Sequence, residues 1–194
     1  MVDMKQKTIS LLIAVMTVIS NAYADSWEFP AEKTEDEFKF GDVTILRTLD
    51  ARKDQQHPAF YLSIYREDNL EAKFKGVYFE DIYASDDNQH FIGLSNDGLP
   101  GTAFVLFDGR GNLIRIQNHE YPLFDYCEMS VTRSRKWYAE SPAAEFKYKT
   151  VYGVQYLDSV EFTDCHGERK SIKQYLAEGY KRMALLSPSP AVAD

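Results

Sequence analysis

Short runs of alternating apolar and polar residues constrain this chain more than any other feature. The alternation is clear in 43–49 and in 60–65, and it recurs in a third set: Phe74, Val77, Phe79 and Ile82. Successive side chains on a strand point to opposite faces, so a period of two predicts half-buried strands. The 13 Tyr, 12 Phe and 2 Trp residues favour the same pleated surfaces.

Turn-forming clusters separate these runs, at 50–58, 66–69 and 85–89. No helical segment intervenes between the strands of this region, which argues against parallel βαβ units. We therefore predict an all-β fold built from antiparallel hairpins.

The clearest hairpin joins 102–107 to 112–116 through the turn at 108–111. We expect Asp108-Gly109 to supply the positive φ of a tight hairpin turn. A fainter copy lies 56 residues later, where Asp, Gly and Ile recur at the same offsets within 164–172. Three matches in nine leave both a true repeat and a chance similarity open.

The C-terminal region changes period. Six residues fall at helical spacing: Ile172, Tyr175, Leu176, Gly179, Tyr180 and Met183. They predict one helix from Ser171 to about Leu186, with Ser171 as the N-cap, followed by a loose tail over 187–194.

Residues 81–116 follow the order strand, Ser-x-Asp turn, apolar strand, small-residue loop, strand, Asp-x-x-Gly turn, strand. This order resembles one blade of a β-propeller, although the Gly-His and Trp-Asp landmarks of the WD40 family are absent. The resemblance implies a small or incomplete propeller-like fold, because few blades of 40–45 residues fit in this chain.

The first 24 residues read as an export signal. Lys5 and Lys7 precede an apolar run at 9–19, and Ala22-Tyr23-Ala24 offers the small-x-small pattern of signal peptidase sites. The run is too short to span a membrane, although an uncleaved anchor is the alternative. We expect cleavage after Ala24, a periplasmic location, and a single β-rich domain over 25–186.

The chain is acidic, with a net charge of −8 that becomes −9 after this cleavage. Nucleic acid and anionic lipid would repel it, so we expect no nucleic-acid partner and no membrane insertion after cleavage. The charge suits a basic protein surface, and simple solubility explains it equally well.

The only two cysteines are Cys127 and Cys165. Two thiols in one exported domain usually pair, so we predict a structural disulfide, with free thiols as the alternative.

No motif for catalysis or metal binding is convincing. The segment 93–98 is one residue too long for a Gly-x-Ser-x-Gly nucleophile elbow, and Cys165, His166 and Glu168 lack the second ligand cluster of a zinc site. We expect no enzyme activity, no metal and no cofactor. All four histidines lie in or beside predicted turns, so we expect exposed side chains at His57, His90, His119 and His166.

One loop is the candidate for contact with a partner: Ser95, Asn96, Asp97, Gly98, Leu99, Pro100 and Gly101. It is long for a hairpin connection, and Pro100 stiffens it. Such a loop presents backbone groups with little side-chain entropy to lose, although most loops only connect strands.

These features predict an exported, non-enzymatic protein that binds another protein. In compartment, size and charge the chain is similar to periplasmic immunity proteins, which would imply an inhibitor of a secreted hydrolase toxin that degrades the cell wall. The alternative is a binder of carbohydrate or another cell-envelope ligand, using aromatic patches at 137–138 and 121–126, or a hydrolase with an unrecognised site.

Overall fold

The computed structural model of the chain describes residues 30–98, 101–119, 124–130 and 134–176. Within those ranges the chain forms thirteen strands, every pair of them antiparallel, and one helical turn at 173–176. The predicted all-β fold with one C-terminal helix is therefore confirmed.

Two sheets have four strands in sequence order. The first contains β1 (Lys33–Phe40), β2 (Val43–Asp50), β3 (Ala59–Arg66) and β4 (Asn69–Lys75). The second contains β5 (Asp81–Ala84), β6 (His90–Leu94), β7 (Thr102–Asp108) and β8 (Leu113–Asn118).

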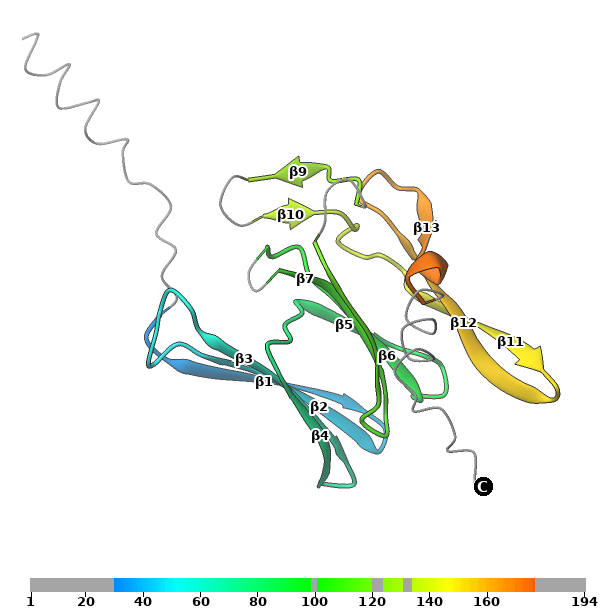
Figure 1. Ribbon diagram of the computed structural model, residues 1–194, viewed down its shortest axis with the longest axis horizontal. Helices are drawn as coiled ribbons and strands as arrows, with labels where there is room; N and C mark the ends of the chain where they lie inside the picture. Colours follow the sequence, from blue (N-terminus) through cyan, green and yellow to red (C-terminus); the bar gives the residue numbers. More distant parts are fainter. Residues whose placement is uncertain (1–29, 99–100, 120–123, 131–133, 177–194) are drawn as a thin grey trace, which may run out of the picture.

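Two smaller sheets follow. One pairs β9 (Glu128–Met129) with β10 (Arg135–Lys136), and the other joins β11 (Glu145–Val151), β12 (Val154–Thr163) and β13 (Arg169–Ser171). Figure 1 shows the β5–β8 sheet in the middle, between the β1–β4 sheet and the β11–β13 sheet.

The central sheet is buried on both faces, which explains why β6 and β7 are almost continuously apolar. Alternate residues of these strands point to opposite sides. One side packs against the β1–β4 sheet and forms a first core: Val43, Ile45, Leu62, Ile64, Val77, Phe79, Phe91, Val105 and Phe107.

The other side of the central sheet forms a second core with β12, the helical turn and the segment around Trp137. Its buried members from the central sheet are Ile92, Leu94, Ala103, Phe104 and Leu106. Its partners across the interface include Trp137, Tyr138, Leu157, Val160, Phe162, Ile172 and Tyr175. This second core positions the cavity described below.

The absence of a side chain at Gly93 allows Phe79 to pack directly against β6 in the first core. A Cβ atom added at this position would lie 2.7 Å from the Cβ and Cγ atoms of Phe79, which is fully buried. We expect Gly93→Ala to lower the free energy of unfolding by about 1–3 kcal/mol, as overpacked cores usually do. Urea denaturation measures this loss, and a change below about 0.5 kcal/mol, the size of an ordinary surface substitution, would contradict the packing.

The two related hairpins share one turn geometry. In each, Oδ1 of the leading Asp accepts hydrogen bonds from the amides two and four residues later, at 2.8–2.9 Å, for both Asp108 and Asp164. The glycine three residues after each Asp has a positive φ, 81° at Gly111 and 83° at Gly167. The positive φ therefore falls on Gly111 and not on Gly109, because the Asp side chain closes a longer turn.

The structure confirms the predicted strands at 43–49 and 60–65 and the hairpin of 102–116. The alternation from Phe74 to Ile82 is not one strand, because β4 ends at Lys75 and β5 begins at Asp81. Residues 81–116 form a meander in the order expected of a blade, and any up-and-down sheet has that order too.

The predicted helix begins later than expected. Ser171 is the last residue of β13, and helical structure starts at 173. The Ser171 Oγ still accepts a hydrogen bond from the Lys173 amide at 3.3 Å, so it caps the first turn from the strand side.

Some predictions lie outside the described residues. These are the signal peptide, the domain limits at 25 and 186, the helix beyond 176 and the tail. Among the residues that the structure describes, no helix is both long and apolar enough to cross a membrane.

Candidate functional site

The predicted partner loop is largely an internal junction. Ser95 and Asp97 are buried, with 0% and 4% exposure, and Gly98 and Gly101 are half-buried. We expected these polar side chains at the surface, and for Ser95 and Asp97 that expectation is wrong. Leu99 and Pro100 lie outside the described residues.

Hydrogen bonds explain the burial. The indole Nε1 of Trp137 donates to the Ser95 carbonyl oxygen at 2.8 Å, and the Asn96 side-chain oxygen accepts from the Trp137 amide at 3.0 Å. The Asn96 amide donates to Glu80 at 2.6 Å, and its carbonyl oxygen accepts from the Arg135 amide at 2.7 Å. The described part of the segment therefore fastens β6 to the chain around 135–137.

Among the residues that the structure describes, the most exposed apolar surface lies elsewhere, at the end of the β11–β12 hairpin. We call its four side chains the hairpin tip: Val151, Tyr152, Val154 and Tyr156. Tyr152 is fully exposed, and the other three are between 38% and 52% exposed. Figure 1 shows this hairpin reaching beyond the other labelled strands. A cluster of exposed apolar side chains on one protruding element is typical of an interaction site.

The turn itself points to the same conclusion. Val151 pairs with Val154, so Tyr152 and Gly153 form a two-residue connection with φ values of 51° and 78°. Two positive φ values match a type I′ turn, which prefers Asn-Gly because a bulky residue is strained there. Tyr152 occupies the strained position without any burial in return, so folding alone gives no reason for a tyrosine.

Two ion pairs link the part of β12 next to the hairpin tip to neighbouring elements. Asp158 on β12 pairs with Lys149 of β11 at 3.1 Å and with Lys173 of the helical turn at 2.5 Å. Exposed pairs of this kind contribute little to stability. The first pair links the two strands of the hairpin, and the second links β12 to the helical turn. This hairpin was not predicted from the sequence. The signal that could have found it is Tyr-Gly between two runs rich in aromatic and β-branched residues.

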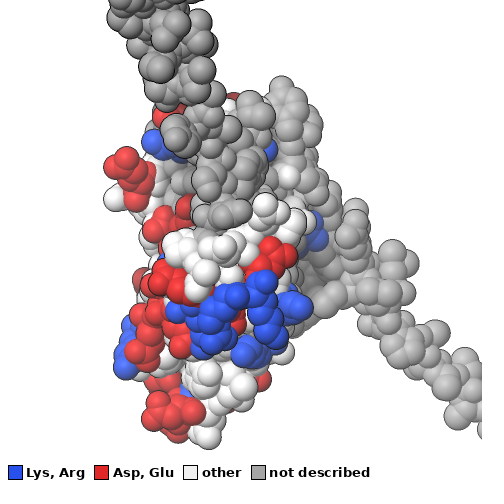
Figure 2. Space-filling model, turned by 90° about the vertical axis from the view of Figure 1, so that its left-hand side faces the viewer, with Lys and Arg blue, Asp and Glu red and all other residues white. Residues whose placement is uncertain are grey.

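On the side of the molecule where the β1–β4 sheet lies, the described charged side chains are of both signs (Figure 2). Figure 2 shows the side on which the β1–β4 sheet lies, with Lys and Arg beside Asp and Glu. Pairs such as Lys33–Glu35 at 2.5 Å and Arg52–Asp50 at 2.6 Å account for part of this mixture.

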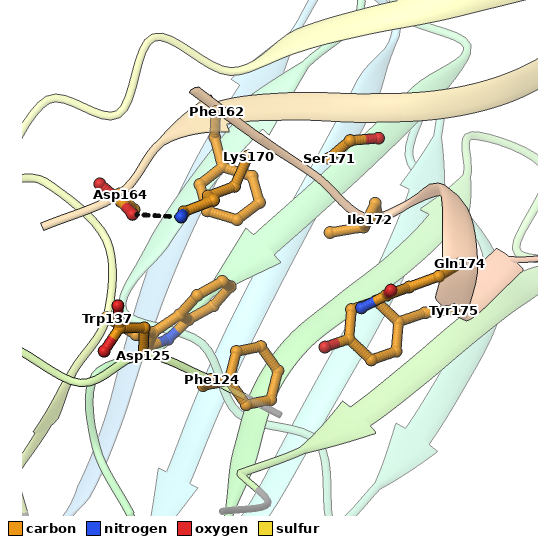
Figure 3. Close-up of a pocket in the computed structure, with 10 residues that line it drawn as sticks. All are labelled: Phe124, Asp125, Trp137, Phe162, Asp164, Lys170, Ser171, Ile172, Gln174 and Tyr175. Atoms are coloured by element: carbon orange, nitrogen blue, oxygen red, sulfur yellow. Dashed lines mark ion pairs between the residues drawn. The ribbon is translucent and has the colours of Figure 1, made fainter. Parts of the chain in front are cut away.

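A cavity of about 290 Å³ opens at the edge of the second core (Figure 3). Its apolar lining includes four rings, which we call the aromatic wall: Phe124, Trp137, Phe162 and Tyr175. The rings pack on each other, with Phe124 and Trp137 centroids 4.7 Å apart and Phe124 stacked on Tyr175 at 5.9 Å. Trp137 and Phe124 belong to the predicted aromatic patches, but they are buried in the core and not spread over the surface.

The polar lining includes Asp125, Asp164, Lys170 and Gln174. Asp164 is only 3% exposed, and the Lys170 ammonium lies 3.3 Å from its Oδ2 atom. Burial raises the pKa of Asp164, but the Glu168 amide and Lys170 outweigh this, so the pKa lies below the ordinary 3.8. The carboxyl is therefore an anion in the neutral pH range.

The predicted disulfide is present beside this cavity. The Cys127 and Cys165 sulfur atoms lie 2.09 Å apart, so both are used in the bond and neither is a thiolate. Asp125 and Asp164 flank the bridge in the sequence. The His166 Nε2 atom lies 3.5 Å from Asp125. The disulfide thus joins the two chain segments that carry the cavity's acidic groups.

Two histidines differ from the expectation of exposure. His57 and His166 are exposed, but His90 is half-buried with its Nδ1 atom 3.0 Å from the Tyr148 hydroxyl. His119 is half-buried among the rings of Phe124, Tyr126 and Trp137. His90 is the first residue of β6 and His119 directly follows β8, and the packing of these strands against neighbouring segments could not be predicted from the turn signals alone.

We expect His119 to make stability fall in mild acid. Burial, followed by repulsion from Arg135, lowers its pKa from 6.5 to about 4, although Ser95 and Asp97 oppose the shift. Below pH 6.5 the unfolded chain binds a proton that the folded chain does not, so stability decreases from pH 6.5 to 4.

Thermal melting across this range tests the His119 prediction. His119→Gln should flatten the loss relative to the unsubstituted protein. Parallel curves for the two proteins would assign the acid sensitivity to other groups.

Comparison of the chain with protein-family models, with curated proteins and with solved structures found no match.

Proposed function

We propose that this chain is an exported, non-enzymatic protein that binds another protein through the hairpin tip. The observation that carries the proposal is Tyr152, which is fully exposed at a strained, positive-φ position on a protruding hairpin. Val151, Val154 and Tyr156 surround it with further exposed apolar surface. Folding gains nothing from this arrangement, whereas a partner with a cleft would bury all four side chains.

The hairpin has the physical properties of an inserting element. Its two strands are hydrogen bonded along their length, from Glu145↔Glu161 to Val151↔Val154. A preformed element loses little conformational entropy when it binds. Tyrosine is also among the residues that most often dominate binding energy at protein interfaces. The tip is therefore suited to fill a cleft.

The finer proposal is a periplasmic inhibitor or immunity protein that acts on a secreted toxin that degrades the cell wall. A disulfide is compatible with an oxidising compartment, and the signal-like first 24 residues agree with export. The net charge of −8 would favour a partner with a basic surface around its cleft. Inhibition would follow if the tip occupied the substrate cleft of the hydrolase.

Site-specific photo-crosslinking tests the proposal in the cells that produce the protein. The variant Tyr152→benzoylphenylalanine carries the crosslinker at the tip. The matched control is Leu70→benzoylphenylalanine, because Leu70 is another exposed apolar residue, on β4 of the first sheet. We expect one discrete crosslinked protein from position 152 and none from position 70.

The captured protein is then purified and assayed on isolated cell wall. Addition of the exported chain should reduce its hydrolytic activity. Crosslinking of the same proteins from both positions would contradict the role of the tip. A captured partner whose activity is unchanged would leave protein binding in place and remove the inhibitor function.

A further inference from the structure

The cavity beside the disulfide has one feature that the fold does not explain. The Oδ2 atom of Asp164 is buried and accepts no hydrogen bond from the described residues. The neighbouring Lys170 ammonium is an ion-pair partner at 3.3 Å, and the same ammonium donates a shorter hydrogen bond to Glu168 at 2.7 Å. Figure 3 shows Asp164 and Lys170 together on one side of the cavity.

The matching turn of the other hairpin shows what a purely structural Asp looks like. Asp108 uses Oδ1 to hold its turn, as Asp164 does, but its Oδ2 accepts a hydrogen bond from the Asn112 side chain at 2.8 Å. In the Asp164 turn the corresponding position is Glu168, which cannot donate. Among the described residues the second oxygen of Asp164 therefore has only the Lys170 ammonium beside it, at 3.3 Å, and a further donor would have to come from outside the chain.

The size and lining of the cavity limit what that donor can be. A volume of about 290 Å³ equals the liquid volume of about ten water molecules, and it lies at the small end of ligand pockets. A cavity of this size can hold one six-membered ring but not a peptide segment. The aromatic wall offers flat apolar contact, whereas the buried carboxylate requires a hydrogen-bond donor.

The charged lining suits a ligand that both donates and accepts hydrogen bonds. Asp164 and Asp125 disfavour an anion, and a cation would have to compete with the Lys170 ammonium that already lies beside Asp164. A wholly apolar ring would cover the carboxylate without satisfying it. A neutral ring that carries several hydroxyl groups can donate to Asp164, accept from Lys170 and still present carbon–hydrogen surface to the rings.

We propose that this cavity binds one neutral saccharide ring, with its hydroxyl groups on Asp164 and Lys170 and its carbon face against the aromatic wall. The site is separate from the hairpin tip. The protein would therefore hold a cell-envelope sugar at one place and a protein partner at another.

Fluorescence of Trp137 measures this binding. The chain has one other tryptophan, so Trp27→Phe gives a background in which only the cavity residue reports. The probes are methyl glucoside and N-acetylglucosamine, titrated into the full mature protein, with cyclohexanol as a ring of similar size that carries a single hydroxyl group. We expect saturable binding of a saccharide at millimolar concentration, with calorimetry as a second readout.

The key variant is Asp164→Asn, which keeps an oxygen for the turn amides and replaces the second oxygen by an amide nitrogen. The matched control is Asp108→Asn, the same change in the same turn on the other hairpin. We expect the first to weaken saccharide binding about tenfold, the loss of one charge-assisted hydrogen bond, and the control to leave it unchanged. Lys170→Met should weaken it similarly, and Tyr152→Ser should not.

Three results would overturn the proposal. One is the lack of any saturable saccharide signal in the folded protein. The second is equal affinity of Asp164→Asn and Asp108→Asn, which would place the sugar elsewhere. The third is binding of cyclohexanol as tight as that of either saccharide. Because Tyr152→Ser separates the two sites, failure here leaves the protein-binding function standing.

Discussion

Cys127→Ser is expected to lower the free energy of unfolding by about 4 kcal/mol. The bridge to Cys165 closes a loop of 38 residues, and the chain-entropy model assigns about that value to a loop of this length. The loop contains β9, β10, β11 and β12, so the unfolded chain gains freedom across four strands. For a domain of this size the thermal midpoint should fall by roughly 8–16 °C.

Thermal and urea denaturation of Cys127→Ser, Cys165→Ser and the double variant measure this loss. All three should be equally destabilised, and reducing agent should bring the unsubstituted protein to the same midpoint. A loss below about 1 kcal/mol, under the usual range for a native disulfide, would contradict the account. Two thiols reactive in the native, unreduced protein would do the same.

Local signals explain which parts of the fold could be predicted. The hairpin of 102–116 was found because its turn is closed by neighbours in sequence, with Asp108 bonding to amides two and four residues later. The strands at 43–49 and 60–65 each have one face in the first core. Their apolar and polar residues therefore alternate with a period of two, which is visible in the sequence.

Strands with little burial left no such signal. Most of β1 is exposed, with a burial pattern in which only Phe38 and Phe40 reach even intermediate burial. The tip half of the β11–β12 hairpin is exposed on both faces. Apolar and polar residues alternate in a strand when one of its faces is buried in the core. A strand that has no buried face lacks this pattern and is hard to recognise from the sequence, even when it carries a function.

The candidate sites depend on contacts between distant segments. Ser95 was expected at the surface because its segment is rich in turn formers, but its carbonyl oxygen is the acceptor for the Trp137 indole, 42 residues away. The cavity likewise combines residues of 124–125 with residues of 162–175. Sequence alone named Trp137 and Cys165 as notable, but it could not show that they lie beside one cavity.

Tyr152→Ser is expected to weaken binding to the partner by about 30-fold or more. A buried aromatic anchor at an interface typically contributes 2–4 kcal/mol, and Tyr152 is the most exposed large apolar residue among those the structure describes. The substitution should leave folding stability nearly unchanged, because the side chain packs against nothing in the free protein and surface changes rarely exceed about 0.5 kcal/mol.

Recognition through the hairpin tip can be measured as the dissociation constant of the partner captured from position 152. Calorimetry would compare the unsubstituted protein with Tyr152→Ser and with Leu70→Ser, the equally conservative loss of an exposed apolar side chain on the first sheet. We expect a loss of about 30-fold or more for Tyr152→Ser and a change within about twofold for Leu70→Ser. Equal affinities for all three proteins, measured on folded samples, would contradict recognition by the hairpin tip.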